Sequence, residues 1–286
     1  MKRGLVLSGG GTKGAFQAGV LEVLVLWYGQ HFEDLHGVSV GALHVGLLGA
    51  FLHDQPIAIA RMRELWENLN ERDVHTKYSW PMVIARLALG KQGIYDNTPT
   101  QRLILKHIGE GPLPATVGLV DVESGEYCAV PATAKTMWAS ATMPLIWPLV
   151  DGHLVDGGVR HVTPLAEAID AGVDEITVVR CNMRKTEPAP RPRNALEVAK
   201  RALDIAMNEI ETNDISETQR INELVRQAEA QGTVLLKADG TPYRYIPLTV
   251  IEPPQPLGDT LDFRLEKLLW RMELGRAAAR RTLEGA

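Results

Sequence analysis

Residues 32–53 have the sequence FEDLHGVSVGALHVGLLGAFLH, and this stretch decides the fold class. The short segment at 32–36 predicts a buried strand, and the apolar stretch at 40–53 predicts a helix. Gly37 and Gly41 lie on either side of the junction, where a tight turn needs residues without side chains. The stretch therefore predicts a strand–turn–helix unit.

The same order of elements comes directly before this stretch. Residues 4–8 predict a buried strand, glycines follow at 9–11, and residues 15–28 carry apolar side chains at helical spacing. Two such units in succession are typical of a mostly parallel sheet covered by helices. We therefore expect an α/β protein.

Further elements are expected along the rest of the chain. The sequence predicts helices at 56–69, 98–108 (Thr98 as N-cap), 164–171 and 261–283, long helices within 195–230, strands at 176–180 and 243–251, and a hairpin of 116–122 with 126–130. Three prolines within 187–193 indicate a surface loop, and no separate hydrophobic pattern follows them. We expect one domain over residues 2–286.

Composition narrows the class of protein. The chain has 286 residues, 45% of them hydrophobic, and a net charge of −5, so we expect a sizeable core and no nucleic-acid partner. The two cysteines, Cys128 and Cys181, lack metal-ligand spacing and are expected to be reduced and buried. The longest apolar run, Val38–Leu52, is too short for a transmembrane segment. The expected location is cytoplasmic, with peripheral contact to membranes. The sequence makes no prediction of the oligomeric state.

Ser39 lies in the pentapeptide Gly37-Val38-Ser39-Val40-Gly41, which matches the nucleophile elbow of serine hydrolases. The turn must lift the serine Oγ clear of the backbone, and the helix N-terminus behind it favours developing negative charge. The pentapeptide alone is equally consistent with a glycine-flanked helix cap. Ser39 is the candidate nucleophile because a strand precedes it and a helix follows it.

The first glycine turn is Gly9-Gly10-Gly11-Thr12-Lys13-Gly14. Successive glycine N–H groups can form a nest for an anion such as a tetrahedral oxyanion, with Lys13 adding charge or lying on the surface. The turn also fits the dinucleotide fingerprint, which needs an acidic residue about 20 positions later. Glu33 and Asp34 fall near that spacing but precede the core of their strand. A hydrolase explains both glycine turns, whereas a nucleotide site explains one.

The base that would activate Ser39 has two candidate forms. A triad in the α/β-hydrolase order needs His153 or His161 with Asp96 or Asp121, because no histidine follows His161. The other candidate is Asp156, in Leu154-Val155-Asp156-Gly157-Gly158. A carboxylate can accept the hydroxyl proton directly if its surroundings are dry, although an Asp-Gly turn explains the same residues.

Taken in order, the two glycine turns and Asp156-Gly157-Gly158 resemble the patatin-like phospholipase family. Ala139-Ser140-Ala141-Thr142-Met143-Pro144 is similar to the family's Ala-Ser-x-Ala-x-Pro segment. The hairpin turn Asp121–Gly125 and the late segments Val250–Pro253, Leu261–Phe263 and Gly275 are similar as well. The resemblance covers residues 2–279.

The resemblance implies a three-layer α/β/α sandwich with a mostly parallel central sheet and a Ser–Asp dyad. Ser39 would attack a fatty-acyl ester of a lipid at a membrane or micelle surface, with Asp156 as base. Backbone N–H groups of the glycine loop, mainly at Gly10 and Gly11, would stabilise the oxyanion. No metal or organic cofactor is implied. The alternatives are a family member without activity that binds lipids or a partner, and a nucleotide-dependent oxidoreductase.

Two positions depart from the family pattern. Val162 stands where the family often has Asn, and Val40 follows the serine where a small residue is common. Either valine could narrow the site or alter the support of Asp156.

One segment has an open structural role. The apolar residues of 78–95, together with Arg86 and Lys91, could form a lid or a patch at a membrane interface. An ordinary buried helix explains the same pattern and is the preferred interpretation. The apolar residues are Tyr78, Trp80, Pro81, Met82, Val83, Ile84, Leu87 and Leu89.

Overall fold

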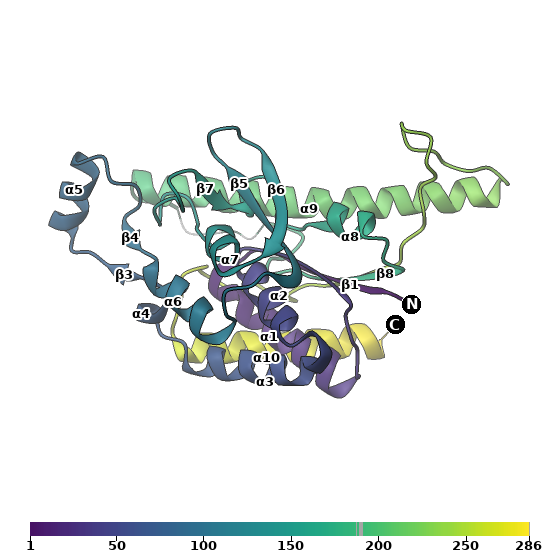
Figure 1. Cartoon of the computed structure of the whole chain (residues 1–286), viewed down its shortest axis with the longest axis horizontal. Helices are drawn as coiled ribbons and strands as arrows, with labels where there is room; N and C mark the ends of the chain where they lie inside the picture. The colour runs from purple at the N-terminus through teal and green to yellow at the C-terminus, as the bar shows by residue number, and fades with distance from the viewer. Residues whose placement is uncertain (187, 189–190, 286) are drawn as a thin grey trace.

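The computed structural model describes residues 1–186, 188 and 191–285, and a seven-stranded sheet forms its middle layer (Figure 1). The order β6-β5-β2-β1-β8-β9 runs across the sheet, and β7 also pairs with β5. The strands are β1 (Arg3–Leu7), β2 (Asp34–Val38), β5 (Leu113–Asp121), β6 (Tyr127–Ala132), β7 (Leu154–Asp156), β8 (Glu175–Val179) and β9 (Leu248–Ile251).

The sheet is mostly parallel, as the sequence predicts. All neighbours from β5 through β2, β1 and β8 to β9 pair in parallel, and only β6 and β7 run antiparallel to β5. The predicted hairpin of β5 and β6 is present. Parallel strands need helical crossovers that cover both faces of the sheet, which explains why every residue of β1 and β2 after the first is buried.

Helices cover both faces, which confirms the three-layer α/β/α sandwich (Figure 1). One layer packs on Leu5 and Leu7 of β1, and the other packs on Val6. The first layer contains α1 (Gly14–Leu21), α2 (Val40–Ala50), α3 (Gln55–Asn68) and α10 (Leu265–Glu284), and the second contains α8 (Leu165–Asp170) and α9 (Ala195–Ala230). None of the helices in the described part of the chain combines the length and apolarity that a bilayer crossing needs.

Several boundaries differ from the sequence predictions. The first predicted helix becomes π-helical at Glu22–Trp27, the strand predicted from 243 begins at Leu248, and the last helix begins at Leu265. Helix α6 (Thr98–His107) has Asn97 as its N-cap, because the Thr98 hydroxyl donates to Asp96 instead. The short helices α4 (Glu71–Val74) and α7 (Ala134–Ser140) were not predicted. Residues 187, 189 and 190 of the predicted proline-rich loop lie outside the described residues.

The segment 76–95 projects from one end of the molecule, on the side where α9 begins and opposite the side where α9 ends (Figure 1). Strands β3 (Thr76–Lys77) and β4 (Tyr95–Asp96) pair at its base, and α5 (Trp80–Ala88) forms its tip. The expected buried helix is wrong: Val83 is buried, but most of the other apolar side chains described in this segment are exposed. The predicted helix is present, but among the described residues no other helix or strand packs over the exposed apolar side chains of α5.

Candidate active site

Ser39 occupies a strained turn between β2 and α2. Its backbone angles, φ 57° and ψ −126°, lie in a region that costs a non-glycine residue about 1–3 kcal/mol. A Cβ at Gly37 would collide with the carbonyl of Gly41, and a Cβ at Gly41 would collide with the carbonyl of Leu7. The two glycines therefore allow α2 to pack directly on the ends of β1 and β2, with Ser39 at the bend.

The edge of β5 brings Asp156 to Ser39. Strand β6 occupies one edge of β5, so β2 and β7 share the other. Val38, the last residue of β2, pairs with Gly118, and Asp156, the last residue of β7, pairs with Leu119. The two strands run toward each other, so their carboxyl ends meet at adjacent positions of one strand. Ser39 and Asp156, which lie far apart in the sequence, thus share one site.

Asp156 is a dry carboxyl group, with 1% of its surface exposed. Its Oδ1 accepts the N–H of Gly158 at 2.8 Å, while Oδ2 has no hydrogen-bond partner of good geometry among the described residues. Burial raises the pKa of Asp156 to about 6, against the smaller opposing effects of the Ser39 hydroxyl and the Gly158 N–H. The Ser39 hydroxyl therefore lies near the Asp156 carboxyl group but makes no well-aligned hydrogen bond to Oδ2, as is common before a substrate binds. A carboxylate in this state is a stronger base than one in water.

Ser140 fixes the backbone of the serine turn. Its Oγ accepts the N–H of Ser39 at 3.0 Å and donates to the carbonyl of Gly118 at 2.6 Å. Ser140 lies at the end of α7 and is fully buried, so these bonds hold Ser39 against β5. In the sequence, Ser140 is recognisable only as part of a family-like segment, and no pattern there predicts its role in the site.

Replacing Ser140 by Ala should lower kcat of ester hydrolysis by about tenfold to a hundredfold, because two buried polar groups lose their partner and Ser39 loses its backbone support. Kinetics on a soluble short-chain ester would measure this, with Ser124→Ala in the exposed hairpin turn as the control. Unchanged kcat in Ser140→Ala would show that the turn is held without this side chain.

The glycine loop approaches Ser39 closely. A Cβ at Gly9 would lie 3.1 Å from the Cβ of Ser39, and a Cβ at Gly10 would collide with Cys181. Gly11 has φ +55°, and a Cβ there would lie 2.6 Å from the carbonyl oxygen of Thr260. In the described structure no acceptor meets the N–H of Gly10 or Gly11, so both can donate to an anion beside Ser39.

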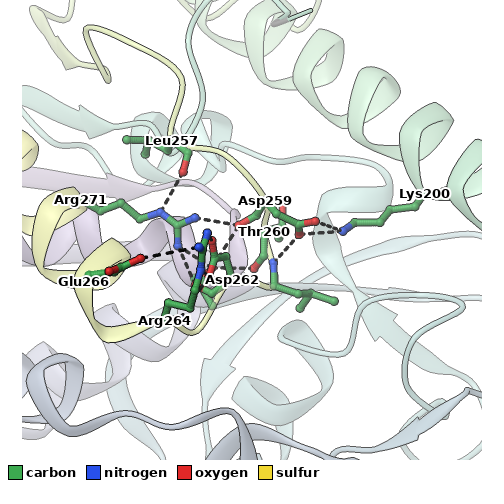
Figure 2. A network of polar contacts seen from close by, with 10 residues as sticks. Lys200, Leu257, Asp259, Thr260, Asp262, Arg264, Glu266 and Arg271 are labelled. Atoms are coloured by element: carbon green, nitrogen blue, oxygen red, sulfur yellow. Dashed lines mark hydrogen bonds and ion pairs between the residues drawn. The ribbon is translucent and has the colours of Figure 1, made fainter. Parts of the chain in front are cut away.

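Arg271 of α10 links this loop to residues 257–262, and Figure 2 shows its contacts with Leu257 and Asp259. Its side chain is fully buried and donates from Nη1 to Thr12 Oγ1 at 2.7 Å, from Nη2 to the Asp259 carbonyl at 2.8 Å and from Nε to the Leu257 carbonyl at 3.0 Å. The N–H of Thr12 in turn donates to the carbonyl of Thr260 at 2.9 Å. The glycine loop and residues 257–262 therefore form one rigid unit.

Lys13 and Gly14 contribute to the loop in different ways. The Lys13 Nζ donates to Asn182 Oδ1 at 2.7 Å and lies at the wall of a polar cavity, so it adds positive charge beside the loop. Gly14 has no such polar role: a Cβ there would collide with Val40. The absence of that Cβ makes room for the bulky Val40 after the serine, which explains how the fold accommodates this departure.

Val162, the second departure, is buried within van der Waals distance of the Cβ positions of Gly9 and Gly158. An apolar side chain there offers no hydrogen bond near the Asp156 carboxyl. Gly158 and Gly157 also pack closely. A Cβ at Gly158 would lie 2.5 Å from Cε of Met207, and a Cβ at Gly157 would lie 2.5 Å from the carbonyl oxygen of Gly118. The two glycines let the β7 turn lie flat against β5, and no other side chain of the described residues hydrogen-bonds Oδ2 of Asp156.

The histidines do not form a triad with Ser39. Among the described residues, no histidine hydrogen-bonds to Ser39 or Asp156: His153 contacts the Asp151 carbonyl and His161 lies 3.5 Å from Asp214. Asp96 and Asp121, the candidate acids, accept hydrogen bonds from their own turns.

His44 lies nearer, in the wall of the apolar cavity, but both of its ring nitrogens are engaged. Nδ1 lies 3.0 Å from Gln17 Oε1, and Nε2 accepts the indole N–H of Trp66 at 3.0 Å. Burial lowers the pKa of His44 to about 3, so the ring is neutral. It therefore has no free lone pair with which to take a proton.

The nucleotide alternative lacks its acidic residue in the right place. Asp34 begins β2, opposite Gly4, whereas a ribose is bound at the carboxyl ends of the strands. Its carboxylate pairs with Lys2 at 2.7 Å and with His36 at 2.9 Å. Glu33 accepts the N–H of Arg3 at the same end. Neither residue can reach a ligand at the glycine loop.

Two cavities meet at Ser39. One, of about 130 Å³, is lined almost wholly by apolar side chains such as Leu47, Met62 and Trp66. The other, of about 300 Å³ and here called the polar cavity, has a mixed lining that includes the basic side chains Lys13, Lys185, Lys200 and Arg201 and the acidic side chains Asp204 and Asp259 beside apolar ones. No site could be predicted on this side from the sequence, because basic residues beside the prolines of 187–193 are typical of a solvated loop. Cys181 is a buried free thiol behind the loop, and Cys128 is free and half-buried.

Comparison with known proteins identifies the family. A crystal structure of VipD from Legionella pneumophila aligns with a TM-score of 0.44 and 13% sequence identity, over 99% of this chain and 67% of that chain. No curated protein sequence matches the chain. Residues 5–169, more than half of the chain, match the family model described as patatin-like phospholipase, and the match includes the glycine loop, Ser39 and Asp156. This chain belongs to the patatin-like phospholipase family.

Proposed function

We propose that residues 2–286 form one lipid acyl hydrolase domain in which Ser39 is the nucleophile and Asp156 its general base. The observation that carries the proposal is the meeting of β2 and β7 on one edge of β5, which places a strained serine beside a buried carboxyl group with one free oxygen. Family membership makes a lipid ester the expected substrate.

The proposed reaction has two stages. Ser39 Oγ attacks the ester carbonyl carbon while its proton passes to Asp156 Oδ2, and the oxyanion accepts the N–H groups of Gly10 and Gly11. The tetrahedral intermediate collapses, the alcohol leaves with the proton from Asp156, and an acyl-Ser39 ester remains. Water then attacks this ester, Asp156 takes the water proton, and the fatty acid leaves as the proton returns to Ser39.

The two cavities fit the two halves of a phospholipid. The apolar cavity would hold the acyl chain, and the polar cavity would hold the phosphate head group among its basic side chains. Ser39 lines both cavities, so the scissile ester would lie at their junction. A family member without activity would not need the free Oδ2 and the two free loop N–H groups, so these atoms favour the enzyme over a lipid-binding protein.

The proposal is tested by incubating the protein with phosphatidylglycerol or phosphatidylcholine in mixed micelles and identifying the products by mass spectrometry. We expect free fatty acid and lysophospholipid, and labelling of Ser39 by a fluorophosphonate probe. Absence of both products and label would contradict the proposal. Stoichiometric NAD(P) binding in calorimetry would favour the oxidoreductase instead.

The dependence of activity on pH should identify the base. Since burial raises the pKa of Asp156 to about 6, kcat/KM should rise as pH increases through about 6 and then level off, because only the carboxylate can accept the Ser39 proton. The measurement is kcat/KM of a soluble ester between acidic and mildly alkaline pH. His153→Ala and His161→Ala should keep this profile, and a rise that disappears in either variant would point to a histidine base.

A further inference from the structure

The segment 76–95, here called the α5 arm, exposes large apolar side chains that no other part of the described structure covers. Trp80, Met82, Ile84 and Leu89 have 69%, 51%, 64% and 77% of their surface exposed. Figure 1 shows the arm projecting beyond the body of the molecule at one end. Single exposed apolar residues are ordinary, but four on one short protruding segment indicate a surface that binds something apolar.

The charge of the arm differs from that of the whole chain. Residues 76–95 contain Lys77, Arg86 and Lys91 and neither Asp nor Glu, whereas the chain carries a net charge of −5. The Arg86 guanidinium lies 4.3 Å above the centre of the Tyr78 ring. Basic residues, aromatic rings and aliphatic side chains together are the composition of segments that lie in the interface of an anionic membrane.

The base of the arm is continuous with the apolar cavity. Ile94 and Tyr95 pack in one hydrophobic cluster with Met143 and Trp147, and these last two residues also line the cavity at Ser39. Val74, directly before β3, belongs to both the cluster and the cavity wall. A lipid that leaves a membrane at the base of the arm would therefore meet apolar side chains along the way to Ser39.

We propose that the α5 arm inserts its exposed apolar side chains into the surface of a membrane that contains anionic phospholipids, and so places the mouth of the apolar cavity against the lipid. The delivery of lipid to Ser39 rests on the proposed function, but binding of the arm to the membrane does not. The membrane is favoured over a second copy of the chain because the arm is uniformly basic, and two such arms would repel each other.

The test is flotation of the full chain with phosphatidylcholine vesicles, with and without phosphatidylglycerol, in a Ser39→Ala background that keeps the lipid intact. We expect binding to vesicles that contain phosphatidylglycerol, and a loss of about tenfold or more in the partition constant for Ile84→Asp. Val234→Asp is the matched control, since Val234 is 68% exposed and lies beyond the end of α9. It adds the same charge and should bind as the parent does.

Equal binding by the parent, Ile84→Asp and Val234→Asp would overturn the proposal. So would a dimer in light scattering that Ile84→Asp dissociates in the absence of vesicle binding, because the arm would then be a surface for self-association. With Ser39 restored, Ile84→Asp should keep its activity on a soluble short-chain ester and lose activity on vesicles. If the protein binds vesicles but hydrolyses no lipid, the proposed function is wrong and this inference stands. If it hydrolyses micellar lipid but Ile84→Asp binds vesicles as well as the parent does, this inference is wrong and the proposed function stands.

Discussion

Asp156→Asn should abolish hydrolysis and at the same time stabilise the fold. The amide cannot take the Ser39 proton, so we expect kcat to fall by about a thousandfold or more. Burial raises the pKa of Asp156 from 3.8 to about 6. Above pH 6 the carboxylate is therefore charged in both states, and its charge costs more free energy in the folded protein than in the unfolded chain. The shift corresponds to about 3 kcal/mol of stability that Asn would recover.

The stability of the wild type should depend on pH in a direction that follows from the raised pKa of Asp156. A raised carboxyl pKa means that the folded state binds the proton more tightly, so the wild type loses stability as pH rises from 3.8 to 6. The gain in Asp156→Asn, measured by denaturant unfolding, should be full at pH values well above 6 and about half as large near pH 5. Asp170→Asn, on the exposed end of α8, should change neither activity nor stability. A less stable but active Asp156→Asn protein would contradict the assignment.

Replacing Ser39 by Ala should remove the nucleophile and lower kcat by about ten-thousandfold or more. The backbone at Ser39 stays in its left-handed conformation, so stability should change by less than about 1 kcal/mol. Ser39→Gly should be equally inactive but more stable than Ser39→Ala by about 1–3 kcal/mol, because glycine adopts φ 57° without strain.

Hydrolysis of a long-chain p-nitrophenyl ester and denaturant unfolding of the three proteins would measure both effects. Wild-type turnover in Ser39→Ala would show that another residue is the nucleophile. Equal stability of the Ala and Gly variants would show that the turn relaxes when the hydroxyl is removed.

The sequence was sufficient for the central layers of the fold. Strand β1 is buried on both faces, so it stands out as an apolar run, and β2 was recognised because Gly37 and Gly41 flank the turn between it and an apolar helix. Long helices were predicted within 195–230, and the structure has one continuous helix there, α9, whose first turn is capped where Asn194 Oδ1 accepts the N–H of Glu197. Ser39, Asp156 and the glycine loop could be proposed because each lies on a turn whose glycines leave a local signature.

Other features depend on contacts between distant segments. Nothing in the apolar residues before Asp156 indicates that β7 continues along the edge of β5 that β2 leaves free. The basic residues Lys185, Lys200 and Arg201 line the polar cavity only because α9 crosses that side of the sheet. The helical pattern of α5 predicts one apolar face, but only the fold decides whether a partner covers it.

The hydrogen bonds from Arg271 to Thr12 and to residues 257–262 determine how much of the chain is needed to keep the glycine loop in place. The family match ends at residue 169 and contains the proposed nucleophile Ser39, the proposed base Asp156 and the glycine loop. The side chain that fixes the loop enters from a helix almost a hundred residues later in the sequence. A fragment or chimaera that kept only the matched part would carry each reacting group and lose the scaffold that aligns two of its N–H donors. The smallest fragment expected to carry the proposed activity therefore extends to α10.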